Sequence, residues 1–166
     1  MRLQHPFEPL CSSSCEILIL GSFPSAASRE GSFYYDHPRN RFWKILSCVF
    51  DRELPQSHEE KRQFLLSCRT AVWDVVKSCE ITASGDSTIR NAEVNDLTEI
   101  LSSSRISRIF ANGSAAYRIY QAQCSEKYGI SAVKLPSSSP ANASKSTDEL
   151  CREWREKICG TAAGTQ

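Results

Sequence analysis

Residues with the capacity for chemistry are most concentrated in one short stretch, GSFYYDHPRNRFW, at positions 31–43. Its aromatic side chains offer flat faces that stack on planar rings. The amide of Asn40 carries two hydrogen-bond donors and an acceptor, so it could bind the edge of a heterocycle or hold a water molecule. The stretch is also consistent with the aromatic-rich start of a buried helix, in which Asn40 only satisfies a loop carbonyl.

The overall charge neither indicates nor excludes a nucleic-acid partner. The sequence holds 20 Lys and Arg residues against 19 Asp and Glu residues, a net charge of +1, whereas a protein dedicated to tight DNA binding is usually more basic. Any contact to phosphate must therefore come from a local cluster, such as Arg29, Arg39, Arg41 and Lys44.

Eight cysteines raise the question of disulfides or a bound metal. The N-terminal segment MRLQHPFEPL lacks the apolar core of a signal peptide, so we expect a protein of the cytosol or nucleoid, where thiols stay reduced. Cys11 and Cys15 are the closest pair, and no C-x-x-C spacing occurs. We therefore expect mostly buried thiols and no metal. No apolar run approaches the roughly 18–20 residues that a membrane span needs.

The elements that must position these residues include four predicted strands. They are EILIL (16–20), AVWDVV (71–76), RISRIFANG (105–113) and SAVKL (131–135), which are short, apolar and rich in β-branched residues. Segments without helical periodicity follow three of the strands, at 21–36, 82–96 and 136–144. Aperiodic segments of this length in a compact domain are usually functional.

Helices are predicted between the strands. Pro38 suits the first turn of a helix that Asp36 or His37 caps. The buried face of this helix is predicted to consist of Phe42, Ile45, Leu46 and Val49. Further helices are predicted over 58–68, near 96–102, from a cap at Ser114 to about 128, and after the S-x-x-E capping box of Ser146 and Glu149. The last helix is expected to turn Leu150, Cys151, Trp154 and Ile158 inward.

Strands that alternate with helices predict an α/β fold, a three-layer αβα sandwich around a mostly parallel four-stranded sheet. We expect one domain over residues 1–160 and a flexible tail over 161–166. Ligands bind such folds at the carboxyl ends of the strands, and the three aperiodic segments leave the sheet at that edge. A single site is therefore predicted there.

Seven segments, taken in order, resemble the uracil-DNA glycosylase superfamily, in particular its branch of hypoxanthine-DNA glycosylases. They are HPFEP (5–9), LILGSFPS (18–25), FYYDHPRNRFWKIL (33–46), WDVV (73–76), NDL (95–97), ANGSAAY (111–117) and LPSSSPANA (135–143). GSFPS joined to YY-x-HP-x-N-x-FW is highly specific. The resemblance implies a uracil-DNA glycosylase-like fold and a monofunctional enzyme that flips a deaminated base, most simply hypoxanthine, out of DNA. It also implies hydrolysis of the N-glycosidic bond by water, with no metal or diffusible cofactor.

The resemblance gives the central polar role to Asn40. The uracil and mismatch branches place Asn or Asp in a G-x-[ND]-P loop, where it positions the attacking water. Here that place is Phe23, which cannot polarise water. In the hypoxanthine branch the important residue is instead the Asn of H-P-x-N, which corresponds to Asn40. In the first turn of its predicted helix, Asn40 would lie where unpaired N–H groups favour an anion, such as the departing base.

The resemblance also implies residues that hold the extruded base. Phe23, Tyr34 and Tyr35 could replace the lost base stacking, with Tyr35 foremost; core packing is the alternative for the first two. Asp74 stands where the uracil-excising branch carries its base-reading Asn, and its carboxylate could accept the N1–H of hypoxanthine, a proton that adenine lacks. Capping of a nearby loop is the alternative for Asp74. Ser22 is a further base-binding candidate, and Ser84, Asp86 and Asn91 are weaker ones.

LPSSSPANAS resembles the superfamily motif that pinches DNA phosphates and fills the space left by the flipped base. Small hydroxyls and exposed backbone N–H groups suit phosphate contact. The DNA-binding candidates are Ser25, Arg39, Ser137, Ser138, Ser139, Pro140, Asn142 and Lys145. A Ser-Pro-rich surface loop is the alternative. His37 could be an acid–base group, but beside Pro38 it is more typical of a structural cap.

Three other functions remain open. A uracil or mismatch glycosylase would share the fold, although Phe23 argues against it. A module that binds damaged DNA without cutting it would need no Asn40, and a nucleoside hydrolase would not need the Ser-Pro loop. The expected partner is single- or double-stranded DNA with a deaminated base, bound by a monomer, with no membrane involved.

Overall fold

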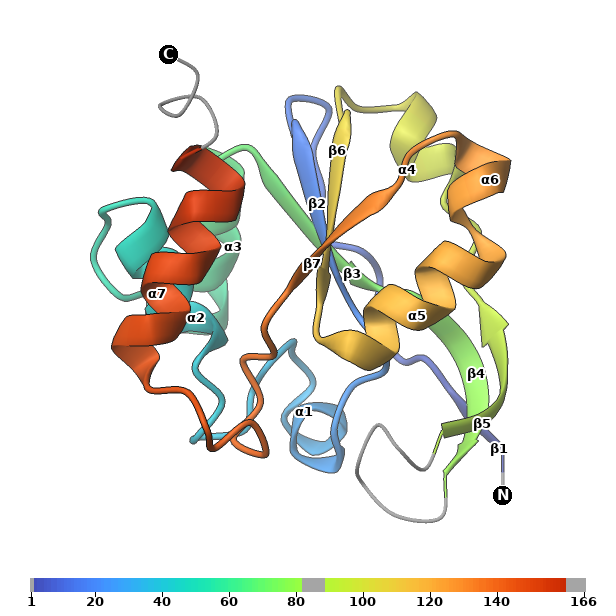
Figure 1. Ribbon diagram of the computed structural model, residues 1–166, viewed down its shortest axis with the longest axis horizontal. Helices are drawn as coiled ribbons and strands as arrows, with labels where there is room; N and C mark the ends of the chain where they lie inside the picture. Colours follow the sequence, from blue (N-terminus) through green and yellow to red (C-terminus); the bar gives the residue numbers. More distant parts are fainter. Residues whose placement is uncertain (1, 82–88, 161–166) are drawn as a thin grey trace.

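The protein is described by a computed structural model that covers residues 2–81 and 89–160 (Figure 1). Four strands form one sheet, in the order β3 (Thr70–Asp74), β2 (Ile17–Gly21), β6 (Arg108–Asn112) and β7 (Ala132–Leu135). All three pairings are parallel, and each connection is long enough to return the chain to the same edge. The predicted parallel sheet is confirmed.

Helices cover both faces of this sheet, which confirms the predicted three layers (Figure 1). One layer holds α2 (Phe42–Val49), α3 (His58–Ser67) and α7 (Thr147–Arg155), which continues into a π-helical turn (Glu156–Gly160). The other layer holds α4 (Thr98–Ser102), α5 (Ser114–Gln123) and α6 (Ser125–Tyr128). Ile17 and Ile19 pack into the first core, and Leu18 and Leu20 pack into the second. The run EILIL is apolar throughout because β2 is buried on both sides.

The contact between α2 and α7 is made by the residues predicted for it. Phe42, Ile45, Leu46 and Val49 are buried, as are Leu150, Cys151, Trp154 and Ile158. The rings of Phe42 and Trp154 meet edge to face, with their centroids 5.9 Å apart. Nε1–H of Trp154 donates to the carbonyl of Pro136 at 2.8 Å, and the capping box of Ser146 and Glu149 is present. This packing anchors the segment that leaves β7.

A second sheet escaped prediction. β1 (Arg2–Gln4), β4 (Val76–Ile81) and β5 (Ile89–Val94) form an antiparallel sheet in the order β1–β4–β5. The predicted strand 71–76 is therefore split at Val75 between two sheets, and the predicted loop 82–96 contains β5. The sequence IRNAEV of β5 has no buried residue, so its pairing with β4 leaves little hydrophobic signal.

Several local predictions were wrong at element boundaries. The predicted loop 21–36 contains a short helix, α1 (Ala26–Gly31), and Ser25 caps it by accepting from the N–H of Ser28. Ser114 is the first residue of α5 rather than its cap; the cap is Gly113, whose φ of 99° favours glycine. The predicted helix to residue 128 divides into α5 and α6. Ser84, Asp86 and the predicted tail lie outside the described residues.

The cysteines, the possible metal ligands and the lengths of the helices bear on the remaining predictions. All eight cysteines are free thiols. Within residues 2–81 and 89–160, no group of three or more His, Cys, Asp or Glu residues is arranged to hold a metal ion. No helix in this part of the chain has the length and apolar character that crossing a membrane requires.

Replacement of Trp154 by Ala tests the packing of α7. The indole is fully buried, so its loss leaves a cavity and an unpaired Pro136 carbonyl. We expect the free energy of unfolding to fall by about 3–5 kcal/mol, measured by urea denaturation. Leu54→Ala is the control, because Leu54 is 39% exposed, and it should change stability by no more than about 0.5 kcal/mol. Equal effects of the two substitutions would contradict the packing described.

Candidate active site

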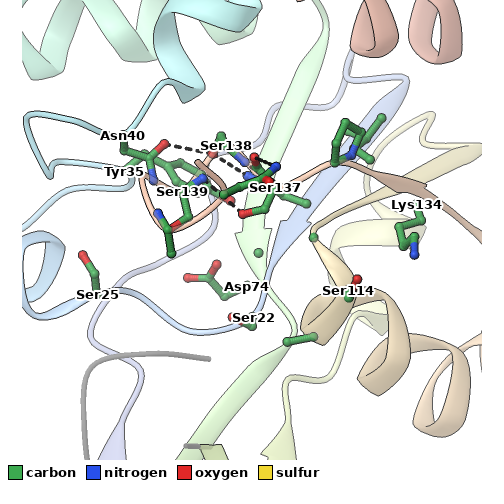
Figure 2. Close-up of a pocket in the computed structure, with 18 of the residues that line it drawn as sticks. Ser22, Ser25, Tyr35, Asn40, Asp74, Ser114, Lys134, Ser137, Ser138 and Ser139 are labelled. Carbon is green, nitrogen blue, oxygen red and sulfur yellow. Dashed lines mark hydrogen bonds between the residues drawn. The ribbon is translucent and has the colours of Figure 1, made fainter. Parts of the chain in front are cut away.

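The carboxyl ends of the parallel strands open into a cavity of about 890 Å³. Most of the predicted site residues line it: Ser22, Phe23, Ser25, Tyr34, Tyr35, Asn40, Asp74, Ser137, Ser138, Ser139, Asn142 and Lys145. Arg39, Pro140 and Asn91 are not among the lining residues, and Asn91 belongs to β5. The segments after β2 and after β7 therefore meet at one cavity, whereas the described part of the third predicted segment, residues 89–96, does not line it. Figure 2 shows Asp74 and Ser22 on one side of this cavity and Asn40 with Ser138 on another.

The floor of the cavity is formed where β2 and β3 end. Gly21 and Asp74 are register partners, and a Cβ at Gly21 would collide with Oδ1 of Asp74 and lie 2.6 Å from the hydroxyl of Tyr35. Glycine is therefore required here by the close approach of two side-chain oxygens. Tyr35 adopts a positive φ of 55° and stacks on Phe42, with ring centroids 3.9 Å apart. The phenol and the carboxylate thus converge at the exit of β2.

Asp74 has a partner that sequence analysis missed. Its Oδ2 lies 2.8 Å from Nε2 of His5, and the two side chains are only 4% and 3% exposed. The chain enters this position from β1, since the N–H of His5 donates to the carbonyl of Lys77 on β4. Asn95 also braces the strand end, because its amide donates to the carbonyl of Asp74 at 2.8 Å. His5 and Asn95 lie in HPFEP and NDL, two of the segments that resemble the superfamily, but nothing in the local sequence links them to Asp74.

Asn40 faces the cavity in a fixed orientation. Its Oδ1 accepts from the N–H of Phe42 and from Oγ of Ser138, each at 2.9 Å. A backbone N–H can only donate, so the amide oxygen must face the helix, and Nδ2 points away from it. Among the described residues, Nδ2 has no hydrogen-bond partner. The amide therefore offers its donors, not its oxygen, to a ligand.

The predicted start of this helix was wrong. α2 begins at Phe42 with Arg41 as its cap residue, and Pro38 instead lies in a turn closed by the N–H of Asn40 and the carbonyl of His37. Asn40 therefore precedes the helix, and its side chain satisfies the first helical N–H. His37 caps the turn rather than the helix, because its Nδ1 accepts from the N–H of Arg39.

Asp36 was the other predicted cap, and it does not cap α2 either. Its carboxylate lies 3.3 Å from Nε2 of His58 and 3.7 Å from Nζ of Lys61. Asp36 thus joins the segment before α2 to α3.

A second asparagine, Asn112 at the end of β6, holds the loop that reaches Asn40. Nδ2 of Asn112 donates to Oγ of Ser138, and its Oδ1 accepts from the N–H of Ser138, both at 3.0 Å. Since the Ser138 hydroxyl accepts from Asn112, its own proton is directed to Asn40. Ser138 is 1% exposed. Its hydroxyl is engaged inside the protein, so the side chain acts on the position of Asn40.

Arg41 shapes the rest of the loop after β7. Its guanidinium donates to the carbonyls of Ser139, Asn142 and Lys145, at 2.7–3.0 Å. The backbone N–H of Arg41 donates to the carbonyl of Ser138 at 3.1 Å. This arginine, predicted as part of a phosphate-binding cluster, is therefore committed to backbone carbonyls.

The aromatic residues divide between the cavity and the core. Tyr34 is 3% exposed, its hydroxyl donates to the carbonyl of Glu8, and burial raises the pKa of Tyr34 far above its usual range. Its ring belongs to the first hydrophobic core, so core packing accounts for Tyr34. Phe33, Phe42 and Trp43 are core residues, as predicted. Phe23 is 8% exposed and belongs to the second hydrophobic core, and it also lines the cavity.

Basic side chains that sequence analysis missed stand at the mouth of the cavity. Arg118 on α5, Lys134 on β7 and Lys157 beyond α7 line it together with Ser114. They are dispersed along the chain, so no local run of charge marked them. Lys145 also lies here, paired with Glu153 at 2.5 Å, and this hydrogen bond raises the pKa of Lys145.

Comparisons with known proteins point to one family. Two proteins described as hypoxanthine DNA glycosylases are similar to the chain. The one from Methanosarcina acetivorans is 34% identical over 144 residues, which are 84% of this chain and 89% of that protein. The one from Methanosarcina barkeri is 31% identical over 93 residues, 55% of this chain and 59% of that protein.

A solved structure and a family model also match the chain. A solution NMR structure from Methanosarcina acetivorans, provisionally described as a uracil DNA glycosylase, superposes with a TM-score of 0.78 at 30% identity and covers 94% of this chain and 98% of that one. The sequence matches the family model of the uracil DNA glycosylase superfamily over residues 8–159. The chain therefore belongs to the uracil DNA glycosylase superfamily.

Proposed function

We propose that this protein is a monofunctional DNA glycosylase that removes hypoxanthine from DNA. Membership of the superfamily supports a hydrolase of N-glycosidic bonds in DNA, and the names of two relatives support hypoxanthine as the base. The observation that carries the proposal is the orientation of the Asn40 amide, which turns its donors toward a cavity floored by the Asp74 carboxylate.

In this proposal Asp74 reads the base. A carboxylate accepts hydrogen bonds, and hypoxanthine presents a donor at N1, where adenine presents a lone pair. A base must leave the helical stack to reach a buried carboxylate, since Asp74 is 3% exposed. Tyr35 and Phe23 then replace part of the lost stacking, and Ser22 lines the cavity close to Asp74 (Figure 2).

Asn40 acts on the departing base. When the glycosidic bond between C1′ and N9 breaks, its electron pair leaves with the base; the oxygen of water then bonds C1′, and one water proton ends on the base. Both lone pairs of Asn40 Oδ1 already accept hydrogen bonds, from Phe42 and Ser138, so this oxygen cannot accept one from the attacking water. The remaining contribution of the amide is donation by Nδ2 to the negative charge that develops on the base.

The loop after β7 and the basic mouth hold the DNA backbone. Ser137, Ser139 and Asn142 line the cavity and offer small polar groups that permit close approach of a phosphate. Arg118, Lys134 and Lys157 supply positive charge around them, whereas the charge of Lys145 is balanced by Glu153. Together these groups suit the strand that flanks a flipped nucleotide.

Excision assays on matched DNA duplexes test this function. Each labelled duplex carries a single hypoxanthine, xanthine, uracil or no modified base, and strand breaks are scored with and without alkali. We expect breaks at hypoxanthine only after alkali, because a monofunctional enzyme leaves an intact abasic strand. Cleavage at uracil with none at hypoxanthine would overturn the proposal and favour a uracil glycosylase. Binding without cleavage of any duplex would favour a damage-binding module.

Asn112→Asp tests the chain of bonds that orients Asn40. The substitution keeps the size of the side chain but replaces the donor to Ser138 with an acceptor. The Ser138 hydroxyl should then donate to the new carboxylate and release Oδ1 of Asn40. We expect single-turnover excision of hypoxanthine to slow about ten-fold, since such a lost hydrogen bond costs roughly 1–2 kcal/mol.

The control is Gln123→Glu, which makes the same change of charge on an exposed side chain of α5. It should leave the rate unchanged, and thermal unfolding of both variants separates loss of function from loss of fold. A folded Asn112→Asp protein that excises hypoxanthine at the parental rate would contradict the role given to this chain of bonds.

A further inference from the structure

The pair formed by His5 and Asp74 is too deeply buried to be a surface ion pair. Both side chains are at least 96% buried and their nearest atoms are 2.8 Å apart. A carboxylate in such a place is costly unless it is paired and hydrogen-bonded. Within the described residues, His5 is the partner in the ion pair that Asp74 makes. The hydrogen bonding of Asp74 therefore depends on whether Nε2 of His5 carries a proton.

The carboxylate of Asp74 requires a proton on Nε2 of His5, because an ionised carboxylate can only accept hydrogen bonds, and the backbone of Phe7 suits Nδ1 both as an acceptor and as a donor. The N–H of Phe7 lies 3.2 Å from Nδ1, and its carbonyl lies 3.0 Å from the same atom. In the neutral ring Nδ1 can accept from this N–H, which leaves the proton on Nε2; in the cationic ring both nitrogens donate, and the carbonyl accepts from Nδ1. In both states Nε2–H donates to Asp74.

The surroundings hold the ring in this orientation. Phe7, Phe23 and Trp73 meet the imidazole edge to face, with centroids 5.7–6.4 Å away. The titratable groups that interact with Tyr34 beside the pair are Asp74 itself, Tyr35 from the same segment and Glu8 from the N-terminal segment, and the guanidinium of Arg29 on α1 lies over the ring of Phe23. Tyr34 stays a neutral donor to Glu8, because burial and the charge of Asp74 both raise the pKa of its phenol.

We propose that His5 is a positioning residue that sets the base preference of the site, by occupying Oδ2 of Asp74 and aiming Oδ1 at the cavity as an acceptor. This inference rests on the proposed function of Asp74. Oδ1 lies beside Gly21 at the strand exit, where the hydroxyl of Tyr35 also converges. Asp74 lines the cavity, so a deaminated base that enters it can bring its ring N–H to this carboxylate. Bases whose corresponding ring nitrogen bears only a lone pair, adenine and unsubstituted purine, are repelled there.

Variants that keep or remove the donor test the role of His5. His5→Gln retains an N–H donor near the position of Nε2, whereas His5→Leu fills similar space without one. Single-turnover rates are measured for the full chain on duplexes carrying hypoxanthine or unsubstituted purine, over a range of DNA concentrations. We expect His5→Leu to lower the ratio of the hypoxanthine rate to the purine rate at least ten-fold, and His5→Gln to keep it within about three-fold of the parental ratio.

Asp74→Asn tests whether His5 acts through Asp74. If His5 acts through Asp74, His5→Leu added to Asp74→Asn should change the base ratio no further. A base ratio that is the same in His5→Leu as in the parental protein, or equally low in His5→Gln and His5→Leu, would show that His5 only packs the core and would overturn the proposal. Unfolding midpoints of all four variants identify any that fail to fold.

A second readout does not depend on excision. In protein labelled with ¹⁵N at histidine, we expect a downfield Nε2–H proton signal from His5 that moves in Asp74→Asn. A bare Nε2, with the proton on Nδ1, would overturn the proposal whatever the base range. If the parental protein removes no hypoxanthine but this signal is present, the proposed function fails while the pairing of His5 with Asp74 stands.

Discussion

The hydroxyl of Ser138 joins the two sides of the site, because it accepts from Asn112 at the end of β6 and donates to Asn40 before α2. Each bond fixes the direction of the next. Because the Ser138 hydroxyl accepts from Asn112, it donates its proton to Oδ1 of Asn40. Oδ1 also accepts from the N–H of Phe42, so the amide nitrogen of Asn40 points away from the helix. The loop after β7 can hold this position because the guanidinium of Arg41 binds its carbonyls.

The floor of the cavity depends on strand register as much as on side chains. Gly21 lies beside Asp74 in the parallel sheet, and only the missing Cβ lets Asp74 and Tyr35 approach the same point. The second sheet then brings His5 under the carboxylate. The site therefore combines an acceptor on its floor with a donor on its wall, both held by elements that close packing keeps rigid.

The layers of the fold could be predicted because residues 17–20 of β2 pack alternately into two cores, which leaves an unbroken apolar run in the sequence. The capping box of Ser146 and Glu149 could also be predicted, because its two residues are three positions apart in the sequence. Only part of the site could be predicted from the sequence. The partners of Asp74 and Ser138 are 69 and 26 residues away, at His5 and Asn112, and such bonds have no local signature. The start of α2 was misplaced because Pro38 suits a turn as well as a helix.

In the proposed mechanism, Asn40 stabilises the departing base and does not activate water. The most direct test compares parental and Asn40→Ala proteins on duplexes whose purine analogues leave with graded ease, under single-turnover conditions. We expect the loss caused by Asn40→Ala to grow as the base becomes a poorer leaving group, because the missing donor acts on the charge of that base. A loss of the same size for every analogue would contradict this mechanism.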